Sequence, residues 1–281
     1  MNTDRKSSSA NKAEAIDHTA YTRIFIPNVI YFHLMQFGGF FAALYFLALS
    51  QVSPLWWGLA AFSYFCSSCL GMAITFHRVL AHRTFALPKP LEYLFSWFGM
   101  MGGTGSTIAW IALHRRHHAH PDTDEDPHSP ERFGWKMLFS GFEMKLDWQR
   151  VRDLLRDPFH IFLNRYYIIL IASWATLLFL IHPLAFFFGF LIPASMQITI
   201  SNLSTILGHG HGYRNFETKD HSTNNVLIAA LTWGEGWHNN HHADPRNWRL
   251  GLKWWELDPA AWIITAMTKL GIVKQESFLQ H

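Results

Sequence analysis

The sequence predicts an all-α integral membrane protein, with four transmembrane helices in two hairpins and a cytoplasmic helical cap rich in histidine. Composition supports this fold class. Of the 281 residues, 49% are apolar, 16% are aromatic and only 15% are charged, whereas a soluble domain carries about 25% charged residues. The 18 histidines are nearly as many as the 20 acidic residues. Low charge together with excess histidine indicates a membrane protein with a metal site.

The same composition argues against other classes of protein. A net charge of +3 without a basic tract does not favour nucleic acid as a partner. Two cysteines do not make a disulfide scaffold. Cys66 and Cys69 form a CxxC pair inside a predicted span, where packing is favoured over a redox or zinc role.

The first hairpin is predicted from a segment without Asp, Glu, Lys or Arg, which runs from Ile24 to His77. One membrane crossing needs about 20 apolar residues. This segment therefore holds two spans, at about 26–49 and 55–76, joined by a turn near Pro54.

The second hairpin is predicted in the same way from the charge-free segment between Tyr166 and Tyr213. Its two spans are expected at about 166–181 and 184–206, with the turn at His182.

The basic residues predict the orientation of these spans. Neither turn contains Lys or Arg, and all 23 basic residues lie in the N-terminal tail, in 77–165 and in 207–281. Basic segments face the cytoplasm, so both termini and both of these segments are expected on that side. The tail lacks the apolar region of a signal peptide. We expect residues 1–23 to form a flexible polar tail and 24–281 a single domain.

A third charge-free run, from Tyr93 to His114, contains four glycines. A fifth span there would put the flanking histidine clusters on opposite faces of the membrane. We therefore expect a helix that dips into the membrane or lies against it. The segment 115–165 is expected to be amphipathic and half-embedded, and 259–273 to be an interfacial helix.

Histidine clusters border three apolar stretches. Residues at i, i+3 and i+4 share one helix face, so an HxxHH helix presents three imidazoles toward one point. An HxxxxH pair is about 140° apart around an α-helix, so we expect that span to end or fray at the membrane surface, with the chain turning between its two histidines. The clusters are His77 and His82 (HxxxxH), His114, His117 and His118 (HxxHH), and His238, His241 and His242 (HxxHH).

The eight imidazoles of these clusters exceed what one tetrahedral zinc needs. They suit two metal ions, with positions left for a small molecule such as dioxygen. Imidazole binds Zn, Cu, Fe or Ni, so the residues alone do not name the metal. Single histidines are expected to be structural or solvated; these are His18, His33, His160, His182 and His281.

The three clusters, with their flanking residues, resemble the histidine boxes of the membrane fatty-acyl desaturases of the stearoyl-type (delta-9-like) class. The second box is followed by Asp126-Pro127-His128, and the third is preceded by Gly234-Glu235-Gly236. The stretch that begins at His209 is also similar. The resemblance implies nine iron ligands, namely His77, His82, His114, His117, His118, His209, His238, His241 and His242. His120, His128 and His211 match no ligand position.

The resemblance also implies a reaction. Two Fe²⁺ ions, with O₂ as co-substrate, would introduce a cis double bond into a saturated fatty-acyl chain carried as a thioester or a membrane lipid. The chain has no Rossmann glycine fingerprint, no CxxCH haem motif and no recognisable cytochrome b5 region. Electrons are therefore expected from a separate ferredoxin or cytochrome b5-type protein.

One departure from the family pattern concerns the metal site. The family usually has Asn where Thr205 stands, reaching an iron through water. Thr205 itself, or Asn202 two helical turns before His209, is a candidate for that role. This departure keeps open an alternative product, from a di-iron acyl hydroxylase or acetylenase.

Other residues are candidates for roles around the ligands. Asp126 and Glu235 are the best carboxylates for orienting imidazoles, with the amides of Asn239 and Asn240 as further candidates. Animal acyl-CoA members have an Arg-Asp pair where Ala112-Leu113 stand here, so their recognition of CoA is not carried over. Four tryptophans near the boxes are candidates either for lining an acyl tunnel or for interfacial anchors, namely Trp97, Trp110, Trp233 and Trp237.

Two other functional classes compete with an oxidase. Ligands of a metal transporter usually lie at mid-membrane, whereas these boxes border one surface. A zinc hydrolase needs about three protein ligands and a general base, fewer than the nine histidine ligands that the resemblance implies.

Overall fold

The computed structural model describes residues 19–139, 146–274 and 278, and all of its regular elements within these ranges are helices. The β-type pairing found there is two isolated bridges, which join Asn224 to Tyr213 and to Trp237. The predicted all-α class is therefore confirmed for this part of the chain. Residues 1–18, which include most of the predicted tail, and His281 lie outside the described residues, and α1 begins at Thr19.

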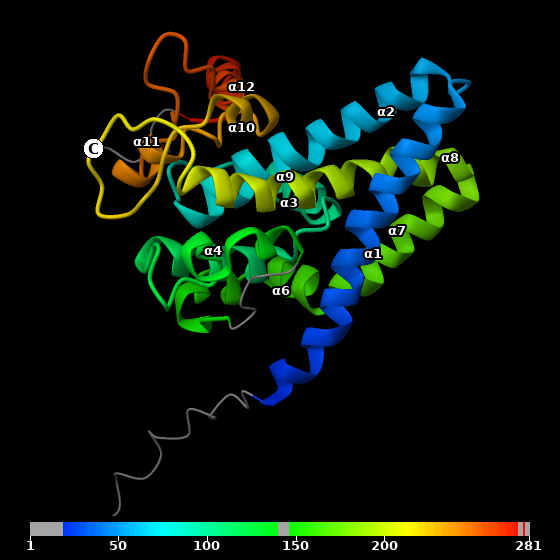
Figure 1. Ribbon diagram of the computed structural model, residues 1–281, viewed down its shortest axis with the longest axis horizontal. Coiled ribbons are helices and arrows are strands. Elements are labelled where there is room, and N and C mark those ends of the chain that lie inside the picture. Colours follow the sequence, from blue (N-terminus) through cyan, green and yellow to red (C-terminus); the bar gives the residue numbers. More distant parts are fainter. Residues whose placement is uncertain (1–18, 140–145, 275–277, 279–281) are drawn as a thin grey trace, which may run out of the picture.

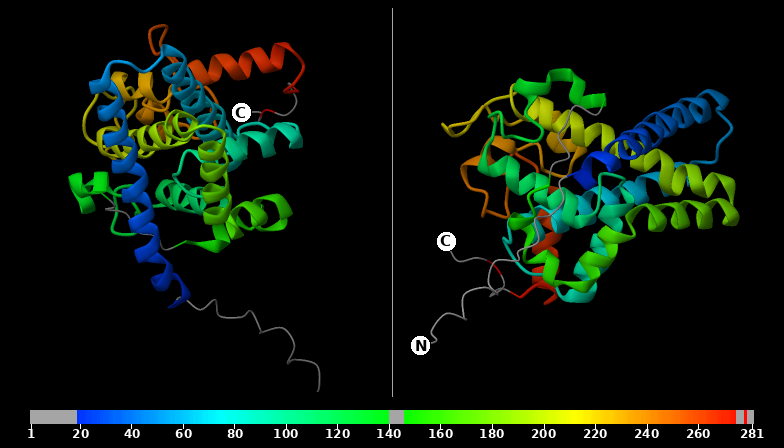
Figure 2. Two further views of the ribbon diagram at one scale, coloured as in Figure 1. Left: turned by 90° about the vertical axis from the view of Figure 1, so that its right-hand side faces the viewer. Right: turned by 90° about the horizontal axis from the view of Figure 1, so that it is seen from below.

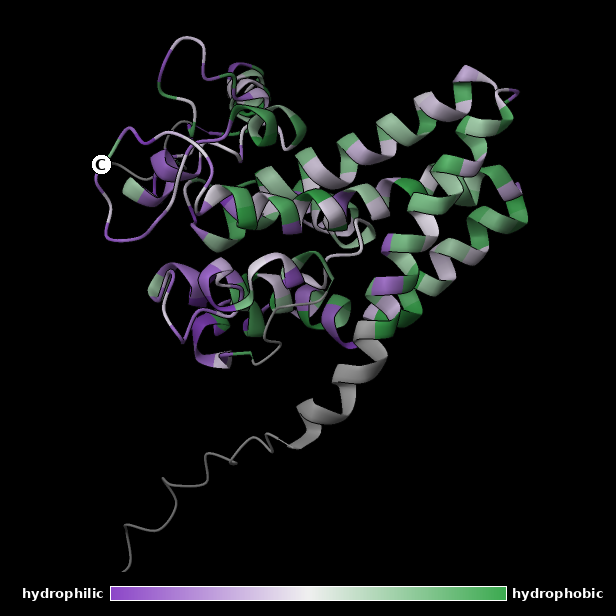
Figure 3. Ribbon diagram, viewed as in Figure 1, coloured by the Kyte–Doolittle hydropathy of each residue, from purple (hydrophilic) through white to green (hydrophobic). Residues whose placement is uncertain are grey.

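Long apolar helices extend toward one end of the molecule, and shorter helices gather at the other end (Figure 1). Figure 3 shows the same division in hydropathy, with apolar residues concentrated along the long helices. The long set consists of α1 (Thr19–Leu49), α2 (Pro54–Tyr64), η1 (Phe65–Ala81), α7 (Tyr167–Ile181), α8 (Pro183–Phe186), η5 (Phe187–Leu191) and α9 (Ile192–Gly208).

The shorter helices, which we call the cap, carry the second and third histidine boxes, whereas His77 of the first box lies on η1. Figure 2 shows α12 lying beside η1, where Ile264 and Met267 pack into the same core cluster as Ala73. These helices are α3 (Lys89–Met101), α4 (Thr107–Ala119), α5 (Pro130–Phe133), η2 (Gly134–Phe139), η3 (Trp148–Val151), η4 (Leu154–Arg156), α6 (Pro158–Arg165), α10 (Val226–Leu231), α11 (His238–Ala243) and α12 (Pro259–Lys269).

Three helical stretches are long and apolar enough to cross a membrane, namely Ile30–Leu49, Pro54–Ala81 and Pro183–Gly208. A fourth crossing is possible if α6 and α7, which bend by 73° at their junction, form one broken span. Alone, α7 has 15 residues, fewer than the roughly 20 that span a bilayer. The apolar helices indicate a membrane protein with three or four spans.

Each turn between two predicted spans is followed by a capping group that marks the start of the next helix. Pro54 occupies the first turn of α2, and Ser53 Oγ accepts a hydrogen bond from Leu55 N at 3.4 Å. His182 Nδ1 accepts from Leu184 N at 3.1 Å at the start of α8. Capping groups and first-turn prolines fix where helices begin, so both predicted turn positions are explained locally.

The helix that carries the first box ends at Ala81, directly before His82, which agrees with one of the two predicted alternatives, but its helical form differs from the prediction. It does not fray between His77 and His82, because η1 is a π-helix, with His82 N donating to His77 O at 3.0 Å. Hydrogen bonds between residues five apart bring those residues onto one face. The HxxxxH pair therefore lies one turn apart on one side, with ring centroids 4.8 Å apart.

The charge-free run from Tyr93 to His114 forms parts of two helices, α3 and α4, separated by a turn at 102–106. Gly103 takes a φ of +78° in this turn, which favours glycine. α3 packs directly on η1, where a Cβ added at Gly71 would lie 2.2 Å from Gly99 N. α4 also contacts η1, with 6.3 Å between the ring centroids of Trp110 and His77, so the second box lies beside the first.

Candidate metal centre

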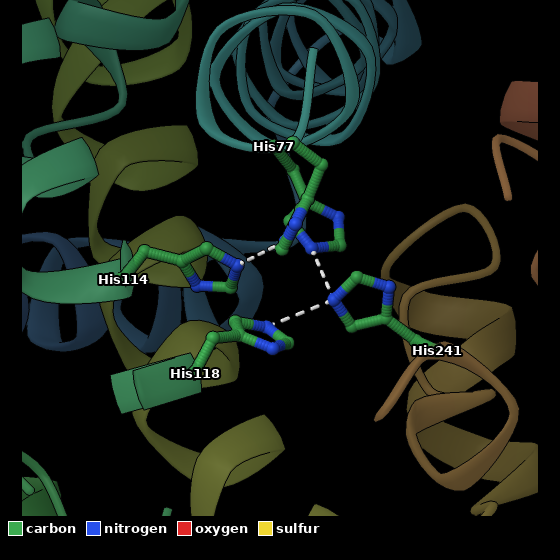
Figure 4. A group of neighbouring side chains, drawn as sticks. His77, His114, His118 and His241 are labelled. Carbon is green, nitrogen blue, oxygen red and sulfur yellow. Dashed lines mark hydrogen bonds between the residues drawn. The ribbon is translucent and has the colours of Figure 1, made fainter. Parts of the chain in front are cut away.

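The nine histidines implied by the resemblance come together in two adjacent groups. The five-histidine group contains His77, His82, His114, His118 and His241, and the four-histidine group contains His117, His209, His238 and His242. Within each group the ring nitrogens that face one another lie within 4.8 Å. Figure 4 shows four members of the first group converging from η1, α4 and α11.

The spacing of the ring nitrogens in the five-histidine group fits a shared metal ion. His241 Nε2 lies 3.0 Å from the Nε2 atoms of both His77 and His118. His82 Nε2 lies 2.8 Å from His114 Nε2. Two nitrogens that each bind one ion at about 2.1 Å and at right angles are about 3 Å apart. The donor atoms therefore suit a common ion.

The four-histidine group has similar spacing. His209 Nε2 lies 2.9 Å from His238 Nε2, and His117 Nε2 lies 3.3 Å from His242 Nε2. The two groups are neighbours, since the ring centroids of His118 and His242 are 4.5 Å apart. An all-imidazole pair of sites is compatible with iron among other transition metals.

Burial keeps the imidazoles able to bind a metal. In the five-histidine group it lowers the pKa of His82, His114, His118 and His241 well below the ordinary value, and neighbouring imidazoles add to this effect. Burial lowers the pKa of His117 and His238 in the same way. These rings are therefore neutral near pH 7, with a lone pair free for a metal ion.

Four carboxylates contact the Nδ1 atoms of four of these histidines, whose Nε2 atoms face the other imidazoles of their group. Glu235 contacts His77 Nδ1, and Asp126 Oδ2 accepts from His117 Nδ1 at 2.8 Å. Asp122 accepts from His209 Nδ1 at 2.9 Å, and Asp220 accepts from His242 Nδ1 at 2.7 Å. A carboxylate at Nδ1 fixes the tautomer that leaves the Nε2 lone pair facing the metal position.

Two of these carboxylates, Asp126 and Glu235, are the ones that sequence reasoning selected. It missed Asp122 and Asp220. Asp122 lies four residues after His118, just past α4, and a local turn brings it toward His209, 87 positions away. No spacing rule links those residues, so only the tertiary fold identifies them.

Asn239 and Asn240 hold the backbone around α11 and not the imidazoles, which corrects the expectation for their amides. Asn239 Oδ1 accepts from Asn215 N at 2.8 Å, and Asn240 Nδ2 donates to Leu250 O at 2.9 Å. Asn224 Oδ1 accepts from Asn239 N at 3.0 Å, capping α11. A helix of six residues needs such tertiary support.

Arg78, adjacent to His77, links the first box to the third. Its guanidinium is 1% exposed and donates to Glu235 Oε1 at 2.7 Å and to Asp258 Oδ1 at 3.0 Å. Arg115 similarly pairs with Asp153, and this contact offsets the effect of burial and lowers the pKa of Asp153 to about 2. The buried pairs of Arg78 and the partly buried pair of Arg115 anchor the elements that carry the histidines.

A cavity of about 180 Å³ lies beside both histidine groups. Its lining includes Trp110 and Leu113 of α4, and Asn202 and Thr205 of α9. Thr205 Oγ1 donates to Ser201 O at 3.3 Å. The water-holding role of Thr205 or Asn202 stays a prediction.

The other tryptophans near the boxes do not line this cavity. Trp97 packs against Trp174, Trp233 packs against Phe65, and Trp237 is buried beneath Trp255. The two cysteines are free and buried, and neither joins a metal-binding group in the described chain. Packing therefore accounts for them.

Three other histidines of the described chain, His33, His160 and His128, have local partners. His33 Nε2 lies 2.9 Å from Phe139 O, and His160 Nε2 lies 3.2 Å from Glu92 Oε1. His128 lies beside Asp126, with 3.7 Å between Nδ1 and Oδ1. These contacts agree with structural roles.

Comparison with known proteins decides the family. The family model for fatty acid desaturases matches residues 54–274. The chain belongs to the fatty acid desaturase family. This desaturase is therefore an oxidoreductase, and its histidine groups lie within the matched region.

Curated relatives of this desaturase cover most of its length. An acyl-CoA C20 Delta5-desaturase from Anemone leveillei is 35% identical, over 86% of this chain and 80% of that protein. An sn-2 palmitoyl-lipid 9-desaturase from Nostoc sp. is 34% identical, over 82% and 86%. An sn-1 stearoyl-lipid 9-desaturase from Anabaena variabilis is 32% identical, over 87% and 91%. These names do not favour the hydroxylase or acetylenase alternative.

Proposed function

We propose that the nine histidines hold two iron ions and that the protein introduces a cis double bond into a saturated fatty-acyl chain. O₂ is the co-substrate, and a separate donor protein, either a ferredoxin or a cytochrome b5-type protein, supplies electrons. The observation that carries this proposal is the convergence of nine imidazole nitrogens into two groups beside one cavity. When bound, the ions would supply the O₂ activation that removal of hydrogen from an unactivated methylene pair requires.

The chain's own residues prepare the site for this chemistry. The four carboxylates keep the Nδ1 atoms protonated, so that the Nε2 lone pairs face the ions. Trp110 stacks on His114, with 4.7 Å between ring centroids, and lines the cavity with Leu113. These apolar groups hold a methylene segment beside the histidines and keep water away. The proposed active domain is 24–281, because its elements from η1 to α11 supply the ligands.

The acyl chain is proposed to reach the site from the membrane side, either as a lipid or as a thioester. Relatives with both kinds of carrier in their names support either form. The helices α4 and α11, which carry six of the nine histidines, lie at the end of the molecule remote from the α1–α2 turn (Figure 1). Together with the distribution of basic residues, this supports a cytoplasmic cap and cytoplasmic termini.

The decisive test is a fatty-acid profile. The chain is expressed with a suitable electron donor and fed saturated acids of several lengths, and double-bond derivatisation with mass spectrometry identifies the products. New cis-monounsaturated chains should appear with the parent and with His211→Ala, and be absent with His241→Ala. Hydroxylated or acetylenic products would overturn the proposed product, and a protein without iron would overturn the proposed centre.

A further inference from the structure

One surface of the cap is apolar, basic and uncovered by the described chain. Trp254 is 93% exposed, Leu257 56% and Trp262 57%. Together with Arg249 and Lys253 they surround a shallow depression. We call these five residues the tryptophan surface. Single exposed apolar side chains are ordinary, but a contiguous patch with a basic rim marks an interaction site.

The charges around this surface are unbalanced. Arg249 and Lys253 are exposed, whereas the two acidic residues that line the depression, Glu256 and Asp258, are 4% and 3% exposed and occupied by internal hydrogen bonds. The surface therefore presents positive charge to its surroundings, and a partner with an acidic face is favoured.

Aromatic rings connect this surface with the four-histidine group. Lys253 Nζ lies 5.6 Å from the Trp255 ring, and the Trp255 and Trp237 rings are in contact at 6.0 Å between centroids. Trp237 is 1% exposed and directly precedes His238 in the chain. Trp237 Nε1 donates to Leu257 O at 2.8 Å, which fixes the inner ring against the surface loop.

The loop beneath the surface is rigidly attached to α11. Glu256 Oε2 accepts from Leu252 N at 2.7 Å and from Asn240 Nδ2 at 2.9 Å. Glu256 Oε1 accepts from Tyr213 OH at 2.6 Å. Asn240 immediately precedes His241, so the loop and the metal-binding helix form one unit. A preorganised surface loses little entropy when a partner binds.

We propose that the tryptophan surface is the docking site of the electron donor, and that the donor is a small redox protein with an acidic face. Electrons pass from the donor through Trp255 and Trp237 toward the four-histidine group. In each transfer the donor's one-electron centre, a haem or an iron–sulfur cluster, is oxidised and a histidine-held metal ion is reduced. No bond forms or breaks in this step. This inference rests on the proposed function, which requires external electrons.

The other occupant that exposed tryptophans suit is the membrane interface. The loop between α11 and α12 lies at the end of the molecule remote from the α1–α2 turn (Figure 1). The contact between the Trp255 and Trp237 rings leads from this loop toward the four-histidine group, which favours a redox protein as the partner. Labelling in lipid nanodiscs distinguishes the two. Trp254→Cys should react with a membrane-impermeant maleimide as fast as Glu125→Cys and much faster than Leu34→Cys, with the parent as blank. Protection of Trp254→Cys to the level of Leu34→Cys would place the surface in lipid and overturn the proposal.

Binding of the full chain in nanodiscs to a reduced [2Fe–2S] ferredoxin and to the soluble haem domain of a cytochrome b5 tests the partner directly. The probe used is whichever of these two proteins delivers electrons to the parent. At low salt, the double variant Arg249→Glu/Lys253→Glu should bind this probe about tenfold more weakly than the parent does. The affinity of the double variant should also lose most of its salt dependence. The matched control Lys136→Glu, a charge reversal on η2, should bind like the parent. Parent-like binding by the double variant would overturn the proposal.

Anaerobic stopped-flow oxidation of the same probe tests the aromatic route. Trp255→Leu should bind with parent-like affinity but oxidise the probe more slowly, and Trp255→Phe should retain the parent rate. Equal rates for Leu and Phe would exclude the route. Dithionite replaces the donor in a single-turnover control. If the double variant forms product with dithionite, the proposed function stands whatever the binding result. If the parent forms none, the proposed function fails independently.

Discussion

The two histidine groups differ in how the protein surrounds them. The five-histidine group has one carboxylate at a ring nitrogen among the contacts of the described chain, Glu235 on His77. The four-histidine group has three, Asp126 on His117, Asp122 on His209 and Asp220 on His242. One group is rich in imidazole, and the other is rich in surrounding negative charge.

The two groups therefore differ in how they would stabilise a metal ion, one by an additional imidazole and the other by carboxylates around its imidazoles. Five imidazoles would leave fewer open positions around a bound ion than four would, so the four-histidine group would have more room for an exogenous ligand. Its three carboxylates raise the basicity of the imidazoles and compensate for the missing one. We therefore expect the two sites to respond differently to the same class of substitution.

The largest expected effect comes from removing one imidazole from each group in turn. His241→Ala and His242→Ala should each abolish product formation and lower the iron content from about two ions per chain to about one. His211→Ala serves as the control because His211 belongs to neither group. Metal analysis and product profiling read the result. Full iron content with full activity in either variant would contradict the assignment of ligands.

Neutralising the outer carboxylates should have a smaller effect that differs between the groups. Asp220→Asn should weaken iron at the four-histidine group by about 10–100-fold, because it removes the acceptor that orients His242. Glu235→Gln should weaken iron at the five-histidine group and also destabilise the fold, because Arg78 loses a charged partner in a buried position.

Iron titration against a competing chelator, with thermal unfolding alongside, separates these two variants. A stability loss in Asp220→Asn as large as that in Glu235→Gln would remove the distinction drawn between the groups.

A methyl group added at the contact between η1 and α3 should act on the five-histidine group alone. The Cβ of Gly71→Ala would meet Gly99 N at 2.2 Å, a backbone atom that cannot rotate away. Such overpacking costs about 1–3 kcal/mol of unfolding free energy, and it displaces the helix that carries His77 and His82. The midpoint of thermal unfolding in detergent should fall. An unchanged midpoint would mean that η1 and α3 move apart without lowering the unfolding free energy, which contradicts the prediction.

The smallest expected effect is that of Gly208→Ala in α9. The added Cβ would lie 3.1 Å from His238 Cδ2, so this ring must shift by a few tenths of an ångström. Stability should change by less than about 0.5 kcal/mol, because alanine favours the helix and offsets the crowding. Iron at the four-histidine group should weaken measurably, and the five-histidine group should keep its iron. If the five-histidine group lost its iron before the four-histidine group did, the expected difference between the two groups would be contradicted.

Much of this organisation is predictable from the sequence, and particular residues show where prediction stops. Charge-free runs locate the apolar helices, and HxxHH spacing groups the imidazoles, because both depend on local periodicity. The π-helical form of η1 is not predictable in this way, since helix rules assume the α-helical period. Asp122 and Asp220 reach His209 and His242 only through tertiary folding. The 73° bend between α6 and α7 is likewise a feature of the folded chain that the length of an apolar run does not reveal.

The π-helix has a thermodynamic consequence for substrate binding. An ion bound by both His77 and His82 would bind only the form of η1 in which residues five apart share a face, and a ligand stabilises the state that binds it. The same helix contributes Ser68 and Met72 to the cavity wall. Metal occupancy and cavity shape are therefore linked, so acyl-chain affinity should depend on iron loading, and iron retention should depend on acyl chain in return.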